Sequence, residues 1–171
     1  MNGYRKIAPT EISGNVFSMI GDEWMLVTAS DSEGNFNTMT ASWGGVGILW
    51  GEPVAFVFVR PQRYTHEFSE DGDRATLSFF RGGYKRELGY CGSKSGRDTD
   101  KIADTGLLPI ETDEGSVGFE QARLILSCRK LYSDKLREAG FHDEAVRAAS
   151  YPMRDYHTVY VYRIEGIYVK E

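Results

Sequence analysis

The segment from Asn37 to Thr65 reads Asn-Thr-Met-Thr-Ala-Ser-Trp-Gly-Gly at residues 37–45, Val-Ala-Phe-Val-Phe-Val at residues 54–59 and Arg-Pro-Gln-Arg-Tyr-Thr at residues 60–65. The first part is small, polar and glycine-ended, so its backbone can closely approach a flat ligand. The second part has the length and composition of a buried strand. The third part places two arginines before an expected helix start, a combination that favours phosphate. This order indicates a phosphorylated aromatic cofactor.

Length and charge set limits on the class of protein. The chain has 171 residues, which suits a single domain over residues 1–171. Its net charge of −5 argues against nucleic-acid binding, which needs a basic face, although local arginines can still bind an anion. Cys91 and Cys128 have neither metal nor disulfide spacing. There is no signal-peptide core or membrane-length apolar run, so we expect a cytoplasmic protein without membrane contact.

Apolar runs and turn residues predict strands with helices inserted between them. Strands are expected at residues 24–29, 37–43, 54–59, 75–80, 122–132 and 156–169. Helices are expected at residues 64–69, 84–91, 98–105 and 143–149, the last within a charged excursion over residues 133–152. Residues 1–15 are expected to be an irregular lead-in, and the alternation over 122–132 predicts a half-exposed strand. These patterns predict an α+β chain with an antiparallel barrel or sandwich.

The glycine-rich run at residues 44–47 does not make a dinucleotide-binding fingerprint. That fingerprint needs a third glycine three residues after the second, where this chain has Trp50, and no βαβ unit follows. The run is therefore expected to be a flexible connection between strands. The histidines at positions 66, 142 and 157 have no paired ligand spacing, so we expect no metal site.

Three motifs in order carry a resemblance to a known family. They are Asn37-x-Met39-Thr40-x-Ser42-Trp43-Gly44-Gly45, Phe58-Val59-Arg60-Pro61-x-Arg63-Tyr64-Thr65 and Tyr90-Cys91-Gly92-Ser93-x-Ser95-Gly96-Arg97-Asp98-x-Asp100-Lys101. Together they resemble the flavin reductase-like FMN-binding split barrels, and flavoredoxins most closely. The resemblance runs from Trp24 to Tyr132 and more weakly to the C-terminus. It implies a mainly β fold, a split β-barrel with inserted helices, that forms a homodimer.

The same resemblance implies FMN as cofactor and names the residues that contact it. Trp43 is expected against the flavin ring, and the phosphate and ribityl chain are expected beside the Arg60–Thr65 segment. The cofactor-binding residues implied are Asn37, Met39, Thr40, Ala41, Ser42, Trp43, Arg60, Arg63, Thr65, Ser93, Ser95 and Lys101. Gln62 stands where flavoredoxin-like members often have serine, so this chain lacks one side-chain hydroxyl that could bind the phosphate.

Two further roles follow from the resemblance. Lys101 is expected near the N1–O2 edge of the flavin, where an ammonium would stabilise the reduced, anionic ring. His157 is expected near the exposed face of the flavin. The residue types alone leave simpler interpretations open: ordinary hairpin polarity in residues 37–43, surface arginines at 60 and 63, helix-capping polar residues in 93–98 and a histidine packed in a strand.

The leading functional hypothesis is an FMN reductase that takes hydride from NADH or NADPH. The protein needs to stack two rings at close distance for this step, and FMN carries the chemistry. One alternative is an electron carrier that keeps FMN and passes electrons to a redox protein partner. Another is an FMN-binding module without redox activity. The sequence does not separate these three.

Overall fold

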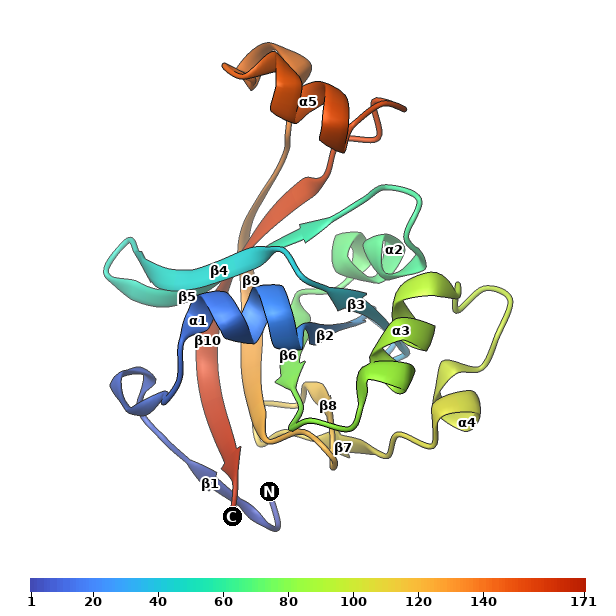
Figure 1. The fold of residues 1–171 in the computed structure, drawn as a ribbon. Coiled ribbons are helices and arrows are strands. Elements are labelled where there is room, and N and C mark those ends of the chain that lie inside the picture. Colours follow the sequence, from blue (N-terminus) through green and yellow to red (C-terminus); the bar gives the residue numbers. More distant parts are fainter.

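Antiparallel strands form the frame of the molecule in the computed structural model, which describes residues 1–171 (Figure 1). Seven strands pair in the order β3-β2-β6-β9-β10-β5-β4, and β1 pairs with β10 beside them. Their bounds are β1 Tyr4–Lys6, β2 Met25–Ser30, β3 Phe36–Ala41, β4 Gly44–Leu49, β5 Glu52–Val59, β6 Arg74–Phe79, β9 Leu124–Lys135 and β10 Thr158–Lys170. A separate ladder joins β7 Pro109–Glu111 to β8 Val117–Phe119. The mainly β prediction is confirmed.

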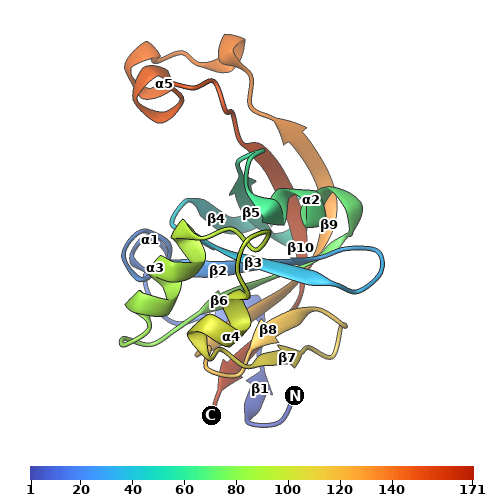
Figure 2. The same ribbon diagram turned by 90° about the vertical axis from the view of Figure 1, so that its right-hand side faces the viewer.

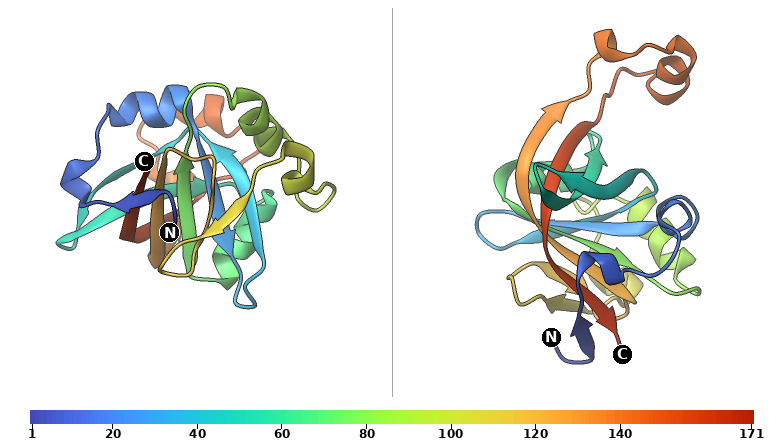
Figure 3. Two further views of the ribbon diagram at one scale, coloured as in Figure 1. Left: turned by 90° about the horizontal axis from the view of Figure 1, so that it is seen from below. Right: turned by 90° about the vertical axis from the view of Figure 1, so that its left-hand side faces the viewer.

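The sheet curls because its two end strands are neighbours in sequence. β3 and β4 lie at opposite ends of the strand order, yet only Ser42 and Trp43 separate them along the chain. The first and last strands therefore have to meet, and Figure 3 shows the resulting curl from below. β3 and β4 form no ladder with each other, so the barrel stays open along this line. We call this opening the split.

Apolar side chains fill the inside of the curled sheet. One cluster of 20 buried residues includes Tyr160 and Tyr162 of β10, Leu126 of β9 and Val57 of β5. These residues face inward because successive side chains of a strand point to opposite faces. A second cluster of nine buried residues, with Phe119 among them, lies on the outer face of the sheet. The sheet around the split therefore carries packed apolar side chains on both of its faces.

Helices occupy the connections between strands, and those over residues 64–71, 85–93 and 101–105 cover one side of the barrel (Figure 2). The principal ones are α1 Val16–Ser18, α2 Tyr64–Asp71, α3 Lys85–Ser93, α4 Lys101–Thr105 and α5 Glu144–Ser150; short turns lie at η1 Pro9–Glu11, η2 Met19–Glu23 and η3 Glu138–Gly140. α2 and α3 both contact β3, so the start of α2 and the end of α3 come to the split. None of the helices has the length and apolar character needed to cross a membrane.

Two expectations about the first third of the chain were wrong. The lead-in contains a strand, β1, which pairs with the end of β10. The glycine run is not a flexible connection but the start of β4, which pairs with β5 from Gly44 to Leu49. Gly44 has φ +141°, and a Cβ there would lie 2.7 Å from the carbonyl oxygen of Phe56. Glycine is therefore needed for β4 to approach β5 at this point.

Two further expectations need correction. β9 is not half-exposed over its first half, because Ser127 on its outer face is fully buried and lies 2.9 Å, hydroxyl to hydroxyl, from Thr112. The β7–β8 hairpin, which local patterns did not indicate, supplies this cover. The third expected helix begins at Lys101 and not at residue 98, since the Asp100 side chain accepts hydrogen bonds from the backbone of Ile102 and Ala103 and so starts the helix there.

The excursion between β9 and β10 stands away from the barrel, as Figure 1 shows for α5. The predicted helix at residues 143–149 is confirmed by α5, which Asp143 caps. The two long strands that carry the excursion pair as far as Lys135 and Thr158. We call residues 136–157 the arm. Its C-terminal end, where the chain returns to β10, reaches the split.

Candidate functional site

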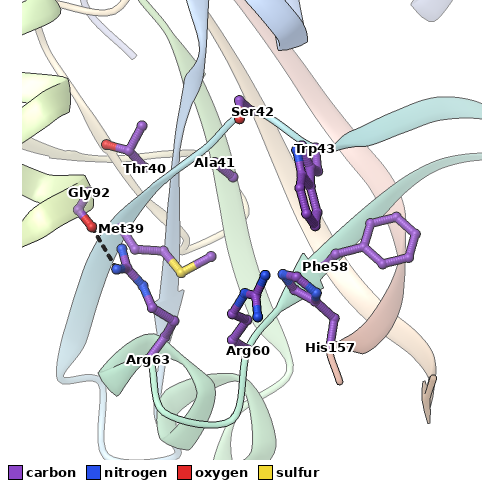
Figure 4. Close-up of a pocket in the computed structure, with 10 residues that line it drawn as sticks. All are labelled: Met39, Thr40, Ala41, Ser42, Trp43, Phe58, Arg60, Arg63, Gly92 and His157. Carbon is purple, nitrogen blue, oxygen red and sulfur yellow. Dashed lines mark hydrogen bonds between the residues drawn. The ribbon is translucent and has the colours of Figure 1, made fainter. Parts of the chain in front are cut away.

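A cavity of about 210 Å³ opens at the split, and we call it the first pocket (Figure 4). The segment that joins β3 to β4 forms one wall, and the ends of β5 and the arm form the other. Its lining residues are Met39, Thr40, Ala41, Ser42, Trp43, Phe58, Arg60, Arg63, Gly92 and His157. The three sequence motifs and the C-terminal histidine thus meet in one place.

Rings and a thioether give the first pocket its apolar surface. Trp43 is an exposed tryptophan, 46% accessible, whose ring centre lies 5.2 Å from that of His157. Phe58 meets His157 edge-on at 6.4 Å, and Met39 extends into the space between the walls (Figure 4). Sulfur and aromatic surfaces of this kind suit a flat aromatic ligand.

On the β3 side of the first pocket, Thr40 and the end of α3 present mainly backbone. The hydroxyl of Thr40 donates to the carbonyl of Leu88 in α3, so its donor is already used within the protein. Thr40 therefore leaves mainly its backbone for a ligand. Gly92, at the end of α3, packs so closely on Thr40 that a Cβ would lie 3.3 Å from the Thr40 Cβ. A larger residue at 92 would push α3 away from β3.

Arg60 carries a charge that the protein itself neutralises. Its guanidinium pairs with the carboxylate of Asp155 and donates to the carbonyl of Ser150 at 2.9 Å. Gln62 donates to the same carboxylate at 2.6 Å. These bonds fasten the arm to the end of β5. They also mean that Arg60 offers little free charge to a ligand.

A second pocket of about 140 Å³ continues from the first, since Met39 and Arg63 line both. It lies between the start of α2 and the loop that follows α3. Its lining residues are Met39, Gln62, Arg63, Tyr64, Thr65, Ser93, Lys94, Ser95 and Lys101. The set contains three cations and several hydroxyls but no carboxylate.

Two of those cations have only backbone carbonyls as partners. Arg63 donates to the carbonyl of Gly92 at 2.6 Å, and the buried ammonium of Lys101 donates to the carbonyls of Thr38 and Cys91 at 2.7 and 3.0 Å. Burial lowers the pKa of Arg63 and lowers the pKa of Lys101 to about 8. A nearby anion would offset this loss of solvation, so the second pocket favours a negatively charged group.

Lys101 is not a solvated surface lysine. Its side chain is buried, and it lines the second pocket together with Arg63 and the two loop serines. It does not line the first pocket. The expectation that its ammonium faces one edge of a flavin ring stays a prediction.

Asn37 lies outside both pockets. Its buried side chain donates to the hydroxyl of Thr65 at 2.7 Å, which ties β3 to the first turn of α2. A Cβ at Gly96 would lie 2.0 Å from the Asn37 oxygen, so the loop after α3 packs directly on this amide. In this structure Asn37 holds together the elements that make the second pocket.

The structure brings together twelve of the thirteen residues expected at the site. Those in the two pockets are Met39, Thr40, Ala41, Ser42, Trp43, Arg60, Arg63, Thr65, Ser93, Ser95, Lys101 and His157. Among the lining residues that the sequence analysis did not assign is Phe58, which lies two positions before Arg60. Strand alternation could have identified it, because residues two apart share a face. No comparable pattern in the sequence identified Gly92 or Lys94 as lining residues.

Comparison with known proteins identifies relatives of this fold. The family model described as "Flavin reductase like domain" matches residues 18–171. No curated protein matches the sequence. Flavoredoxin of Desulfovibrio vulgaris (Miyazaki F) is similar, with a TM-score of 0.68 and 19% identity over 96% of this chain and 78% of that one.

Two other solved structures are similar to this chain. Flavoredoxin from Methanosarcina acetivorans has a TM-score of 0.66 and 22% identity over 96% of this chain and 77% of that one. The styrene monooxygenase flavin reductase from Pseudomonas putida S12 has a TM-score of 0.61 and 18% identity over 87% of this chain and 80% of that one. These similarities confirm the predicted split-barrel fold.

Proposed function

The chain belongs to the flavin reductase like domain family, and we propose that it binds FMN across the two pockets and accepts hydride from NADH or NADPH. One observation carries the proposal. A pocket walled by rings continues, through Met39 and Arg63, into a pocket that has cations and hydroxyls but no carboxylate. A flat ring joined to a terminal phosphate is the ligand that matches this sequence of surfaces.

The residues present fit the proposed cofactor. Arg63 and Lys101 supply positive charge, and the hydroxyls of Ser93 and Ser95 line the same pocket. This proposal assigns Lys101 to the phosphate and not to the flavin edge that the resemblance implies, because Lys101 does not line the first pocket. Such groups form charge-assisted hydrogen bonds to phosphate oxygens. In the first pocket, the Ala41–Trp43 backbone would face the polar edge of the ring, and Trp43 and Met39 would contact its apolar surface. When bound, FMN would supply the ring nitrogen that takes the hydride.

The protein's part in this reaction is to hold two rings in register and to exclude water. The first pocket is open toward solvent beside Trp43, which leaves room for a second ring to enter. No acid or base is required for hydride transfer itself, so stacking geometry is the main contribution. We therefore expect substitutions at Trp43 to lower the rate of reduction more than they lower FMN affinity.

A second copy of the chain is the partner that the surface favours. Trp43 in the link before β4, which lines the first pocket, Ile48 on β4 and Trp50 in the turn after it are exposed, at 46%, 72% and 62%. An apolar edge strand of this kind is usually covered in the functional assembly. A homodimer that buries this edge would bring a second chain close to Trp43 and the first pocket.

Three measurements test the proposal. Mass spectrometry of the ligand released after incubation with excess FMN and FAD should find FMN, and stopped-flow absorbance should show its reduction by NADH or NADPH. A protein that retains no flavin would contradict the binding proposal. FMN that stays oxidised with both nucleotides would contradict the reductase proposal. A monomer in light scattering, with FMN bound at micromolar concentration, would contradict the dimer.

A further inference from the structure

The arm delivers one aromatic side chain to the back of the first pocket. Tyr151 follows α5, and its ring is 4% exposed. It meets His157 edge-on at 5.5 Å, and its hydroxyl lies 2.7 Å from Nδ1 of that histidine. The bonds from Arg60 to Ser150 and to Asp155 fix the chain on both sides of Tyr151. The arm is therefore held where this contact is made.

The geometry decides which way the hydrogen bond runs. The Tyr151 hydroxyl has Nδ1 of His157 as its only side-chain partner, and the nearby backbone N–H of His157 can only donate to it, so the hydroxyl's own hydrogen is left for Nδ1. Buried hydroxyl groups are rarely left without an acceptor. Burial and the nearby Arg60 lower the pKa of His157 to about 4, so the imidazole is neutral at pH 7. A neutral ring that accepts at Nδ1 carries its hydrogen on Nε2.

The Nε2 side of His157 is the free side of the ring. Nδ1 is engaged by Tyr151, and the three rings of Trp43, Phe58 and Tyr151 hold the imidazole plane. Figure 4 shows the far edge of the ring turned to the space between Trp43 and Arg60. His157 lines the first pocket only, away from the cations of the second. This is the end at which the second ring would enter.

We propose that Tyr151 is a positioning residue that holds His157 as an Nε2–H donor toward the carboxamide oxygen of the entering nicotinamide. The nicotinamide part of this inference rests on the proposed function. The tautomer part rests on the arm contact alone. The arm thus orients a side chain of the first pocket. The Tyr151 hydroxyl sets which nitrogen of His157 carries the hydrogen and faces the pocket.

Nitrogen-15 NMR of His157 in the ligand-free protein tests the tautomer. The wild type should show hydrogen on Nε2 alone, and Tyr151→Phe should show a mixture of the two tautomers. Tyr156→Phe is the matched control, because its ring lies 5.0 Å from Tyr151 and its hydroxyl has no hydrogen-bond partner. It should match the wild type. Hydrogen on Nδ1 in the wild type, or an unchanged Tyr151→Phe spectrum, would overturn the proposal.

Steady-state kinetics with FMN-loaded protein tests the nicotinamide part. We expect Tyr151→Phe to lower kcat/KM for the nucleotide about five- to tenfold, the effect of one weakened hydrogen bond, with FMN affinity unchanged. In a His157→Gln background, Tyr151→Phe should have no further effect. An equal loss in that background would assign Tyr151 to packing and overturn the proposal. A wild type that is not reduced would overturn the proposed function and the nicotinamide contact, while the NMR result would still decide the tautomer.

Discussion

The cations that line the two pockets differ in their hydrogen-bond and ion-pair partners. In the first, Arg60 is paired with Asp155, and His157 is neutral. In the second, Arg63 and Lys101 have only carbonyl partners, and no carboxylate lines the space. Carbonyl dipoles reduce but do not cancel a full charge. Around Trp43 and His157 the first pocket therefore offers a nearly neutral surface to a ring, and the second pocket, with Arg63 where the two meet, offers unbalanced charge to an anion.

The difference shows that arginines three residues apart need not share a role. Arg60 and Arg63 stand on either side of a turn that begins α2, and sequence reasoning placed both on a phosphate. In the structure Arg60 fastens the arm to the barrel through Asp155 and the Ser150 carbonyl, and its contact with a cofactor stays a prediction. Arg63 turns to the end of α3, where the second pocket lies. Their hydrogen-bond partners, and not their residue type, distinguish the two arginines.

The largest expected effect tests whether His157, in the first pocket, is neutral in the folded protein. The pKa of His157 is about 4 against an ordinary 6.5, so the unfolded chain binds this proton more readily. The free energy of unfolding is therefore unaffected by the protonation of His157 above pH 6.5 and decreases as the pH falls to 4, by up to about 3 kcal/mol. Denaturant unfolding of wild type and His157→Gln should diverge across that window. Parallel curves would show that folding does not lower the pKa of His157.

The next effect tests the unbalanced charge of the second pocket. Arg63→Ala should weaken FMN binding by about 1.5–3 kcal/mol, or roughly tenfold to more than a hundredfold, because a charge-assisted bond to phosphate is lost. Riboflavin, which has no phosphate, should lose much less. Titration calorimetry with both ligands measures the two values. Equal losses would mean that Arg63 only supports the end of α3 through Gly92.

The pH dependence of binding tests Lys101. Its pKa of about 8 in the free protein should rise when a phosphate is bound, so binding above pH 8 takes up a proton. FMN affinity should then fall as the pH rises from 8, approaching tenfold per pH unit. Lys101→Met should flatten this dependence, and circular dichroism should confirm that the variant folds. The same slope for riboflavin would place the titrating group elsewhere.

The smallest effect concerns Arg60. Because its charge is already paired, Arg60→Ala should leave the ratio of FMN to riboflavin affinity within about fivefold of the wild-type ratio. The variant should instead loosen the arm, which increased protease cleavage within residues 136–157 would reveal. A loss of phosphate discrimination as large as that of Arg63→Ala would contradict the contrast between the pockets.

The sequence predicted most strands, because strands depend on local patterns. Alternation and apolar runs located β5 and β6, and the family resemblance named Arg63, Thr65 and Lys101, which the structure places together along the second pocket. The sequence could not predict that Ser127 is covered by the β7–β8 hairpin, or that the glycine run forms an edge strand. Those features depend on pairing between distant segments. The Arg60–Asp155 pair spans 95 residues, which no local pattern encodes.

The measurement that most directly tests the account compares FMN and riboflavin binding to the wild-type protein by titration calorimetry at one pH and ionic strength. The two ligands share the ring that the first pocket is proposed to hold and differ in the phosphate proposed for the second. FMN should bind at least about tenfold more tightly, and added salt should reduce that advantage. Equal affinities at low salt would contradict the assignment of the second pocket to an anion.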